Sequence, residues 1–253
     1  MKNRFFTAGY RYCFICLLPI AIVCGSASDS HAQNYYPDAF GNTWILRSTD
    51  GLEERLVTIE GPQTIDGDEL TIISDGTYPV SNPASNNPNK FFIKTEPDGV
   101  RIFRAIATVQ ILGELTIDYS PPEIFLPVPI ELGSEWTVYG KATASFFGAA
   151  IKIEATNIAK VVNIEDVTVP AGTFHACLKI EQQLHTQLSP ALVTLPSTSS
   201  TMWLAPDFGL VQSLNNDDIT FELINYNITI DGIVVAVEPK GKLATTWGAL
   251  KKQ

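Results

Sequence analysis

Two side chains that could bind a metal or act as nucleophiles lie close together in the middle of the chain, at His175 and Cys177. On a strand, residues at i and i+2 project from one face, about 6.5–7 Å apart at Cα. His185 has the same parity, but ten extended residues span about 33 Å, so the chain would have to bend to bring it near. Zinc needs four grouped ligands and a reactive thiol needs a suitable environment. We therefore favour a simpler interpretation, in which Cys177 fills a packed or half-buried position.

Acidic residues form two short groups, one at Asp66, Asp68 and Glu69 and one at Asp217 and Asp218. Aspartate in such places satisfies the backbone of turns and solvates loops. Neither group has the alternating spacing of a dedicated calcium loop, although calcium stays open as an alternative. Carboxylate pairs for glycoside hydrolysis meet in space rather than in sequence, and nothing here selects a pair.

The sequence lacks the motifs of the common hydrolases and nucleotide-binding proteins. It has no G-x-S-x-G, no convincing S-x-x-K, no protease-like arrangement of Cys and His, and no glycine-rich phosphate loop. We predict no catalytic, cofactor-binding or metal-binding residue and no cofactor, and we expect a protein that is not an enzyme.

The element that carries His175 and Cys177 is predicted to be a β-hairpin. Pro170-Ala171-Gly172 separates two β-rich runs, and proline presets φ for the first central position of a tight turn. The residues after the turn alternate with strand period, which predicts one buried face. The predicted buried residues are Phe174, Ala176, Leu178 and Ile180.

The composition predicts a mainly β fold. Only 17% of the 253 residues are charged, and Thr, Ile, Val, Pro and Gly are abundant, as is typical of β proteins. We expect an antiparallel curved sheet that forms a half-barrel or open barrel, either continuous or made of two pseudo-repeated halves. Short helices are tolerated only at 148–150 and 247–252.

The first 32 residues have the pattern of a signal peptide. Lys2, Arg4 and Arg11 precede an apolar run at 13–23, and Ser30-His31-Ala32 offers small residues for cleavage before Gln33. The run is shorter than the roughly 20 residues of a transmembrane helix. We expect a periplasmic or extracellular protein that is not an integral membrane protein. Lipidation of Cys24 is a less favoured alternative, because Val23 is a poor residue before a lipidated cysteine.

Removal of this segment changes both the charge and the cysteine count. Three basic residues and one acidic residue are lost, so the formal charge goes from −10 to about −12. Such acidity disfavours nucleic acid and anionic lipid as partners. Cys177 is then the sole cysteine, so no intramolecular disulfide can form.

The mature chain divides into a first β half at 33–119, a proline-rich connector at 120–133, a second β half at 134–237 and a basic tail at 238–253. The connector contains four prolines and is expected to stay out of the sheet interior. Polar loops are expected at 81–89 and 188–200. We expect a first strand anchored by Trp44 and further strands at 56–60, 70–74, 91–96, 100–106, 114–119, 135–145, 150–157, 161–169, 173–184, 201–204, 210–214 and 219–230.

The two halves share a pattern that suggests an ancient duplication. Pro37 to Trp44 and Pro129 to Trp136 both read P-x-x-[FL]-G-x-x-W, and each half later has a Pro-Asp turn before an apolar strand. The alternative is that turn-and-strand entries look alike in any β protein.

Aromatic residues could line an apolar cavity inside such a curved sheet, although core packing explains them as well. The candidates are Tyr35, Tyr36, Trp44, Phe91, Phe92, Phe103, Trp136, Tyr139 and Phe146.

Three motifs resemble a known family: Gly133-Ser-Glu-Trp136, Val167-Thr-Val-Pro-Ala-Gly-Thr-Phe174 and Trp203-Leu-Ala-Pro-Asp-Phe-Gly-Leu-Val211. They are similar to those of exported, β-rich bacterial proteins of unknown function, of the TapB-like kind. The resemblance implies an envelope or secreted location and a strongly curved antiparallel sheet, and it brings no catalytic residues. We expect a non-catalytic envelope protein that binds an apolar ligand or an envelope protein in its concave face. The alternatives are a secreted hydrolase with carboxylates in the cavity and a purely structural surface protein.

Overall fold

The computed structural model describes residues 34–109, 113–146, 149–190, 196–230 and 232–236. They all belong to the second of the two units into which the chain divides, residues 32–253. The predicted signal peptide, Cys24, the cleavage site after Ala32 and the basic tail lie outside the described residues, so these predictions stay untested by the structure.

Thirteen strands and one short 3₁₀ helix make up the regular structure of the described ranges. In chain order they are β1 (Thr43–Ser48), β2 (Glu53–Ile65), β3 (Asp68–Pro79), η1 (Pro83–Ser85), β4 (Asn89–Glu96), β5 (Gly99–Val109), β6 (Gly113–Pro127), β7 (Glu135–Phe146), β8 (Ala149–Val169), β9 (Gly172–Ser189), β10 (Thr198–Ala205), β11 (Gly209–Leu214), β12 (Thr220–Ile230) and β13 (Ile233–Ala236).

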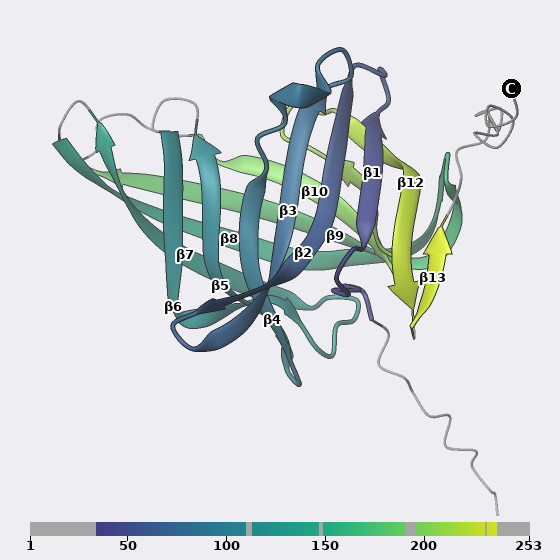
Figure 1. The fold of residues 1–253 in the computed structure, drawn as a ribbon, viewed down its shortest axis with the longest axis horizontal. Coiled ribbons are helices and arrows are strands. Elements are labelled where there is room, and N and C mark those ends of the chain that lie inside the picture. The colour runs from purple at the N-terminus through teal and green to yellow at the C-terminus, as the bar shows by residue number, and fades with distance from the viewer. Residues whose placement is uncertain (1–33, 110–112, 147–148, 191–195, 231, 237–253) are drawn as a thin grey trace, which may run out of the picture. The chain divides into compact units, whose positions relative to one another are not determined.

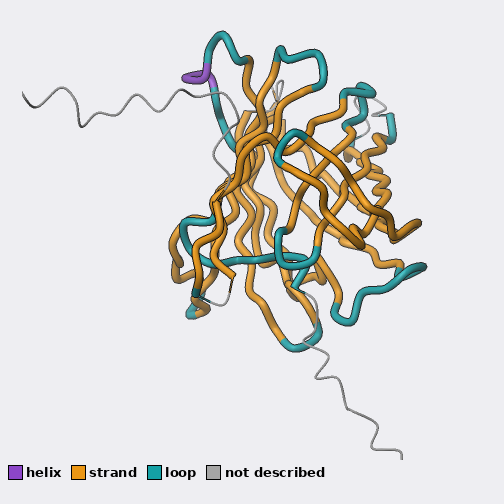
Figure 2. The backbone as a smooth tube through the Cα atoms, turned by 90° about the vertical axis from the view of Figure 1, so that its right-hand side faces the viewer, coloured by secondary structure: helices purple, strands orange, loops and turns teal. Residues whose placement is uncertain are grey.

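Each strand pairs antiparallel with the next one along the chain, and β1 also pairs with β12. Twelve strands therefore close into a barrel, and β13 extends the sheet beyond β12 (Figure 1). Short loops join most of the strands (Figure 2). The predicted curved antiparallel fold is confirmed, and the barrel is closed rather than open. A barrel of about eight strands is filled by its own side chains, so a twelve-stranded one has room for a lumen.

Side chains that alternate between buried and exposed along the strands form the core. In β1, Trp44, Leu46 and Ser48 are buried, while Arg47 between them is exposed. The same large cluster takes Val161 from β8 and Ile180 from β9, both fully buried. Each such side chain stabilises the fold by about 1.5–3 kcal/mol relative to exposure. The barrel is therefore held by apolar side chains from both predicted halves.

Three tight turns join neighbouring strands into hairpins, and the one at Pro170-Ala171 confirms the predicted β-hairpin. Asp66 and Gly67 join β2 to β3 with φ of 53° and 94°, the positive values that a type I′ turn requires at both positions. Pro97-Asp98 joins β4 to β5, and Pro170-Ala171 joins β8 to β9. At the last of these, the Ala171 amide donates a hydrogen bond to the Leu223 carbonyl (3.0 Å), which fastens the hairpin tip to β12.

Two sequence predictions about strands are wrong. The runs at 150–157 and 161–169 form a single 21-residue strand, β8. The proline-rich connector does not stay out of the sheet, because β6 continues to Pro127 and pairs Leu126 with Val100. Pro121 and Pro122 are tolerated because they fall in an irregularity where the pairing jumps from Asp118 to Glu123, so no ladder hydrogen bond is required of them.

Other local predictions also change. β9 runs to Ser189 and enters the predicted loop at 188–200, of which 191–195 lie outside the described residues. Ala149 and Ala150 belong to β8, so no helix forms there. The polar loop at 81–89 holds η1, and β13 was not predicted. Within the described ranges, η1 is the sole helix, and no helix is long and apolar enough to cross a membrane.

The barrel consists of two consecutive sets of six strands with matching landmarks. Trp44 lies in the first strand of one set and Trp136 in the first strand of the other. In each set a Pro-Asp turn joins the fourth strand to the fifth, β4 to β5 and β10 to β11. Phe40 and Leu132 occupy the same place in the repeated motif, and both are strongly exposed. These correspondences support the predicted duplication, which stays a prediction.

Candidate functional site

His175 and Cys177 do not share a face. Where β8 pairs with β9, Glu165 lies opposite Cys177 and Val167 opposite Phe174, so one residue of β8 faces two of β9. This β-bulge shifts the alternation by one position. As a result Ala176 is exposed, contrary to the prediction, and Cys177 is fully buried, whereas Phe174, Leu178 and Ile180 are buried as predicted.

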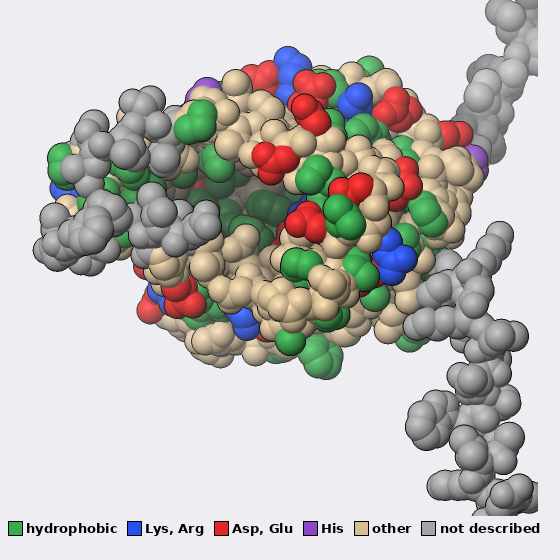
Figure 3. Space-filling view, turned by 90° about the horizontal axis from the view of Figure 1, so that it is seen from above, with side chains coloured by type: hydrophobic (Ala, Val, Ile, Leu, Met, Phe, Trp, Pro, Cys, Tyr) green, Lys and Arg blue, Asp and Glu red, His purple; other side chains and the backbone are tan. Residues whose placement is uncertain are grey.

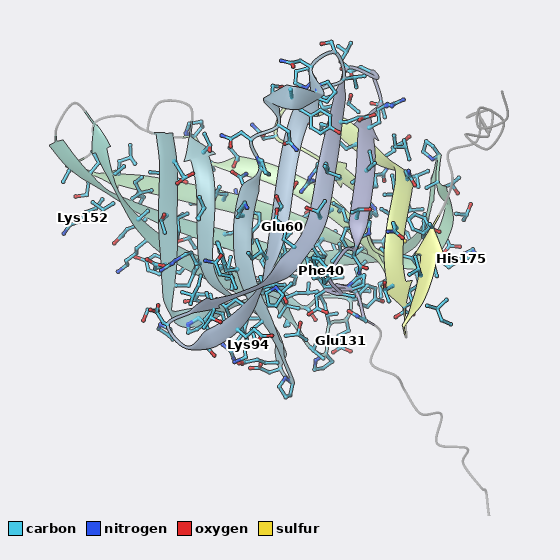
Figure 4. All side chains as sticks on the ribbon, viewed as in Figure 1. Phe40, Glu60, Lys94, Glu131, Lys152 and His175 are labelled. Carbon is cyan, nitrogen blue, oxygen red and sulfur yellow. The ribbon has the colours of Figure 1, made fainter. Side chains whose placement is uncertain are left out.

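Asp166 holds this bulge in place. Its Oδ1 accepts a hydrogen bond from the Ala176 amide (3.1 Å), and its Oδ2 lies 2.8 Å from His175 Nδ1. The hydrogen bond from His175 is the largest cause that lowers the pKa of Asp166. Ala176 has φ of 53°, a left-handed value that is uncommon outside glycine. His175 therefore contributes to the bulge through its contact with Asp166, and it lies at the periphery of the barrel (Figure 4).

The thiol of Cys177 lies in a position unsuited to nucleophilic chemistry. Its side chain is fully buried, with Sγ 3.5 Å from the Phe174 carbonyl oxygen. Burial raises the pKa of Cys177 to about 11, whereas reactive cysteines have lowered values. His185 is elsewhere, with Nδ1 2.7 Å from Ser197 Oγ. Among the described residues, no three His, Cys, Asp or Glu side chains are grouped as metal ligands.

The two acidic groups serve turns and ion pairs. Asp66 is the first residue of the β2–β3 turn, and Asp68 forms a 2.7 Å ion pair with Lys94. In the loop before β12, Oδ1 of Asn215 accepts hydrogen bonds from the amides of Asp217 and Ile219. Asp66 therefore lies in a turn, as predicted, whereas the side chain that binds the backbone of the second loop is that of Asn215.

A cavity of about 250 Å³ lies within the barrel, lined mainly by apolar side chains from both six-strand sets. Four of the nine predicted aromatic residues line it: Tyr36, Trp44, Phe91 and Trp136. Phe125 of β6 joins them and was missed, because the sequence placed it in a connector. The cavity supports the prediction of an apolar site inside the curved sheet.

The other candidate aromatics lie elsewhere. Tyr35 belongs to the core, and Phe92 and Phe103 belong to a separate cluster with Leu70 and Ile72. Tyr139 is exposed, and Lys141 Nζ lies 5.1 Å from its ring centroid. The side chain of Phe146 lies outside the described residues.

The cavity aromatics are fixed in place by hydrogen bonds and ring contacts. Trp44 Nε1 donates to the Phe208 carbonyl (2.6 Å), and Trp136 Nε1 donates to the Phe125 carbonyl (3.0 Å). The Phe125 ring stacks on Phe91 at 6.4 Å and meets the edge of Tyr36 at 5.8 Å. Because these rings are held in fixed orientations, the site is preformed rather than assembled by side-chain rearrangement.

The segment before β1 forms part of the cavity wall. Tyr36 and Pro37 line the cavity from this segment, which lies at the lower end of the barrel in Figure 1. Asn42 anchors it, since its Nδ2 donates to the Pro37 carbonyl (3.1 Å) and its Oδ1 accepts from the Thr229 amide (2.9 Å). The site therefore depends on the first residues of the described chain.

One ion pair points into the lumen. Arg55 of β2 donates from Nε and Nη2 to the two carboxylate oxygens of Asp75 of β3, at 2.9 and 2.6 Å, and from Nη1 to Ser213 Oγ at 3.0 Å. Burial disfavours the charged form of Arg55, but Asp75 outweighs this, and the pKa of Arg55 is raised. Burial also raises the pKa of Tyr36, and the charge of Asp75 adds to this effect. Asp75 is the sole carboxylate among the residues described as lining the cavity.

A second, polar cavity of about 470 Å³ adjoins the first. The two share Arg55, Asp75, Gln182 and Met202, and the second is otherwise lined by residues such as Asn87 near η1. It lies at the end of the barrel that carries η1, and Figure 3 looks down on this end, where the hollow has hydrophobic side chains inside. The lumen thus has a polar mouth and an apolar interior, separated by the Arg55–Asp75 pair.

The comparisons with known proteins add a partial family match. Residues 141–218, less than half of the chain, match the family model described as DUF3108-like. The matched region includes two of the three motifs, Val167–Phe174 and Trp203–Val211, and leaves out Gly133–Trp136. No curated protein matches the chain.

Two solved structures are similar in fold. One is a candidate lipoprotein from Parabacteroides distasonis, with 13% identity, a TM-score of 0.44, and coverage of 76% of this chain and 97% of the other. The other is a candidate exported protein with a YmcC-like fold from Bacteroides fragilis, with 13% identity, a TM-score of 0.41, and coverage of 74% and 96%.

Proposed function

We propose that this chain is an exported, non-catalytic protein of the cell envelope that binds a small apolar molecule inside its barrel. The observation that carries the proposal is the aromatic-lined cavity behind a polar mouth. Ligand sites combine apolar walls with a few placed polar groups. At roughly 30 Å³ for a water-sized group, a volume of about 250 Å³ takes about eight non-hydrogen atoms. The polar end of a slightly longer molecule would extend into the adjoining mouth of about 470 Å³.

A small molecule suits the concave face better than a partner protein does. The concave surface is the inside of a closed barrel, and its cavity is too small for another folded domain. The hydrolase alternative lacks support, because glycosidases need two carboxylates about 5–10 Å apart and the lining offers Asp75 alone, bound to Arg55. A purely structural role would need no hollow interior.

The export half of the proposal depends on the N-terminal pattern. Expression of the full chain in a secreting bacterial host should give a mature protein that begins at Gln33, as read from the intact mass. A lipid-modified protein that begins at Cys24 would replace this part of the proposal with the anchored alternative. A protein retaining Met1 in the cytoplasm would contradict export.

Ligand binding can be tested with a small neutral fluorescent probe, 1-aminonaphthalene, whose emission shifts to shorter wavelength in apolar surroundings. We expect saturable binding to the mature protein. Leu210→Trp, which places a larger side chain in the cavity wall, should reduce this binding at least tenfold. Leu184→Trp on β9, where the side chain is exposed, is the matched control and should bind normally. Equal binding by both variants would show that the probe does not enter the cavity.

A further inference from the structure

The boundary between mouth and interior carries hydrogen-bonding groups that the fold leaves partly unused. Arg55 has five N–H donors, and three of them are engaged, two by Asp75 and one by Ser213. Two N–H groups remain, on a side chain that is 25% exposed. Tyr36 lines the inner cavity close enough to feel the charges of both Asp75 and Arg55, and its hydroxyl makes no hydrogen bond among the described residues. Three donors are therefore available at one place in the lumen.

The charges at this place cancel. The bidentate contact between Arg55 and Asp75 pairs one positive with one negative group. A carboxylate ligand would gain from Arg55 and lose to Asp75, and it would also give up its hydration in the lumen. An ammonium ligand would meet the reverse balance and would face the free N–H groups of Arg55. The acceptor at this boundary, Oε1 of Gln182, already accepts a hydrogen bond from Ser200. A neutral oxygen acceptor meets neither penalty and can accept from the free N–H groups and from the Tyr36 hydroxyl.

The position of these donors also orients the ligand. Arg55 and Asp75 line both cavities, whereas Trp44, Phe91 and Trp136 line the inner one alone. A molecule that enters through the polar mouth would place its apolar chain among the aromatic rings and leave its polar end beside the ion pair. The exposed surface of the inner cavity thus matches an apolar chain, and the boundary matches a single hydrogen-bond acceptor.

We propose that the barrel selects amphipathic ligands with a short apolar chain and an uncharged carbonyl-type head group, such as an ester or ketone, held by Arg55 and Tyr36. This inference rests on the proposed function, since it assigns the ligand class of the same cavity. It assigns distinct roles to the two residues: Arg55 positions the carbonyl oxygen within the neutralised pair, and Tyr36 donates the second hydrogen bond.

The test uses four probes with an eight-carbon chain: methyl octanoate, octanoate, octylammonium and octane, added to the mature protein at pH 7. Trp44 and Trp136 line the cavity, so intrinsic tryptophan fluorescence reports binding. We expect methyl octanoate to bind at least tenfold more tightly than octanoate or octylammonium, and more tightly than octane. Equal or tighter binding of octanoate or octylammonium would overturn the inference while leaving the lumen as a binding site.

Variants distinguish the proposed ligand class from the proposed ligand-binding function. Tyr36→Phe keeps the ring that packs on Phe125 and should weaken methyl octanoate about three- to tenfold while leaving octane unchanged. Tyr139→Phe, on the exposed surface, is the matched control and should change neither. Unchanged ester binding in Tyr36→Phe would refute the role of its hydroxyl. Failure of all four probes and of the neutral fluorescent probe would instead refute the proposed function.

Discussion

The Arg55–Asp75 pair gives the sharpest prediction about stability. Its side chains are 25% and 19% exposed, so it lies between an exposed ion pair and a fully buried one. Exposed pairs contribute about 0–1 kcal/mol, whereas breaking a buried pair costs about 3–5 kcal/mol because a charge is left without a partner. We expect Asp75→Asn to lower the free energy of unfolding by about 1–3 kcal/mol at pH 7.

The double variant distinguishes an unpaired charge from lost packing. Arg55→Met should cost a similar amount, but Arg55→Met with Asp75→Asn should cost less than the two separately, because neither charge is then left alone. We expect a coupling free energy of about 1–2 kcal/mol from the double-mutant cycle. Urea unfolding followed by tryptophan fluorescence measures each corner.

A control comes from an ion pair that is exposed at both ends. Lys160 of β8 pairs with Glu135 of β7, and their side chains are 52% and 54% exposed, so Lys160→Met should cost less than about 1 kcal/mol. Additive costs for Arg55 and Asp75, or a loss no larger than that of Lys160→Met, would show that the lumen pair is solvated like a surface pair. The argument that the ligand has an uncharged head group would then fail as well, because it depends on a desolvated Arg55–Asp75 pair.

Three further predictions concern β8 and β9. Ala176→Gly should raise the free energy of unfolding by about 0.5–1 kcal/mol, because glycine adopts φ of 53° without strain; a loss measured in urea would show that the bulge is unstrained. Gly172→Ala should lower the free energy of unfolding by about 1–2 kcal/mol. This cost comes from the backbone alone, because Gly172 has φ of 148° while the added methyl meets no atom within 4 Å. Gly61→Ala is the control and should be near neutral, because Gly61 has no positive φ. The raised pKa of Cys177 predicts that the unfolded thiol ionises first as pH rises, so stability should fall between about pH 9 and 11. Cys177→Ala should show a smaller fall over this range, and an identical pH profile would contradict the burial of the thiol.

Hairpins and strands could be predicted from the sequence because their signals are local. Asp66-Gly67 and Pro170-Ala171 define turns by backbone preference alone, and alternation identifies the strands beside them. The course of β6 could not be predicted from composition, because Pro121 and Pro122 argue against a strand unless the irregularity that accommodates them is known. Local patterns do not show such irregularities.

The candidate site was only half predictable. Tyr36, Trp44, Phe91 and Trp136 were among the candidates, but Arg55 and Asp75 were not. The sequence did contain a signal for them. Arg55 lies two residues before buried Val57, so both side chains project from the same face of β2, and a charged side chain on a buried face needs a partner. Its partner, 20 residues away, becomes evident only from the register of β2 and β3. The face of Cys177 was misassigned for a related reason, because the bulge places one extra residue in β9 between Phe174 and Cys177.

The junction between the two six-strand sets has a mechanical consequence. Within the described residues, β6 and β7 are joined by two residue pairs, Ile117 with Ala142 and Asp118 with Lys141, whereas β7 and β8 share twelve. Local opening of a structure costs least where the fewest hydrogen bonds must break. The barrel should therefore widen along this junction before any other part of the wall yields. Among the described strands the pairing is sparsest at this junction, so a change in the width of the lumen is expected to begin there; the next sparsest neighbours, β11 and β12, share three residue pairs.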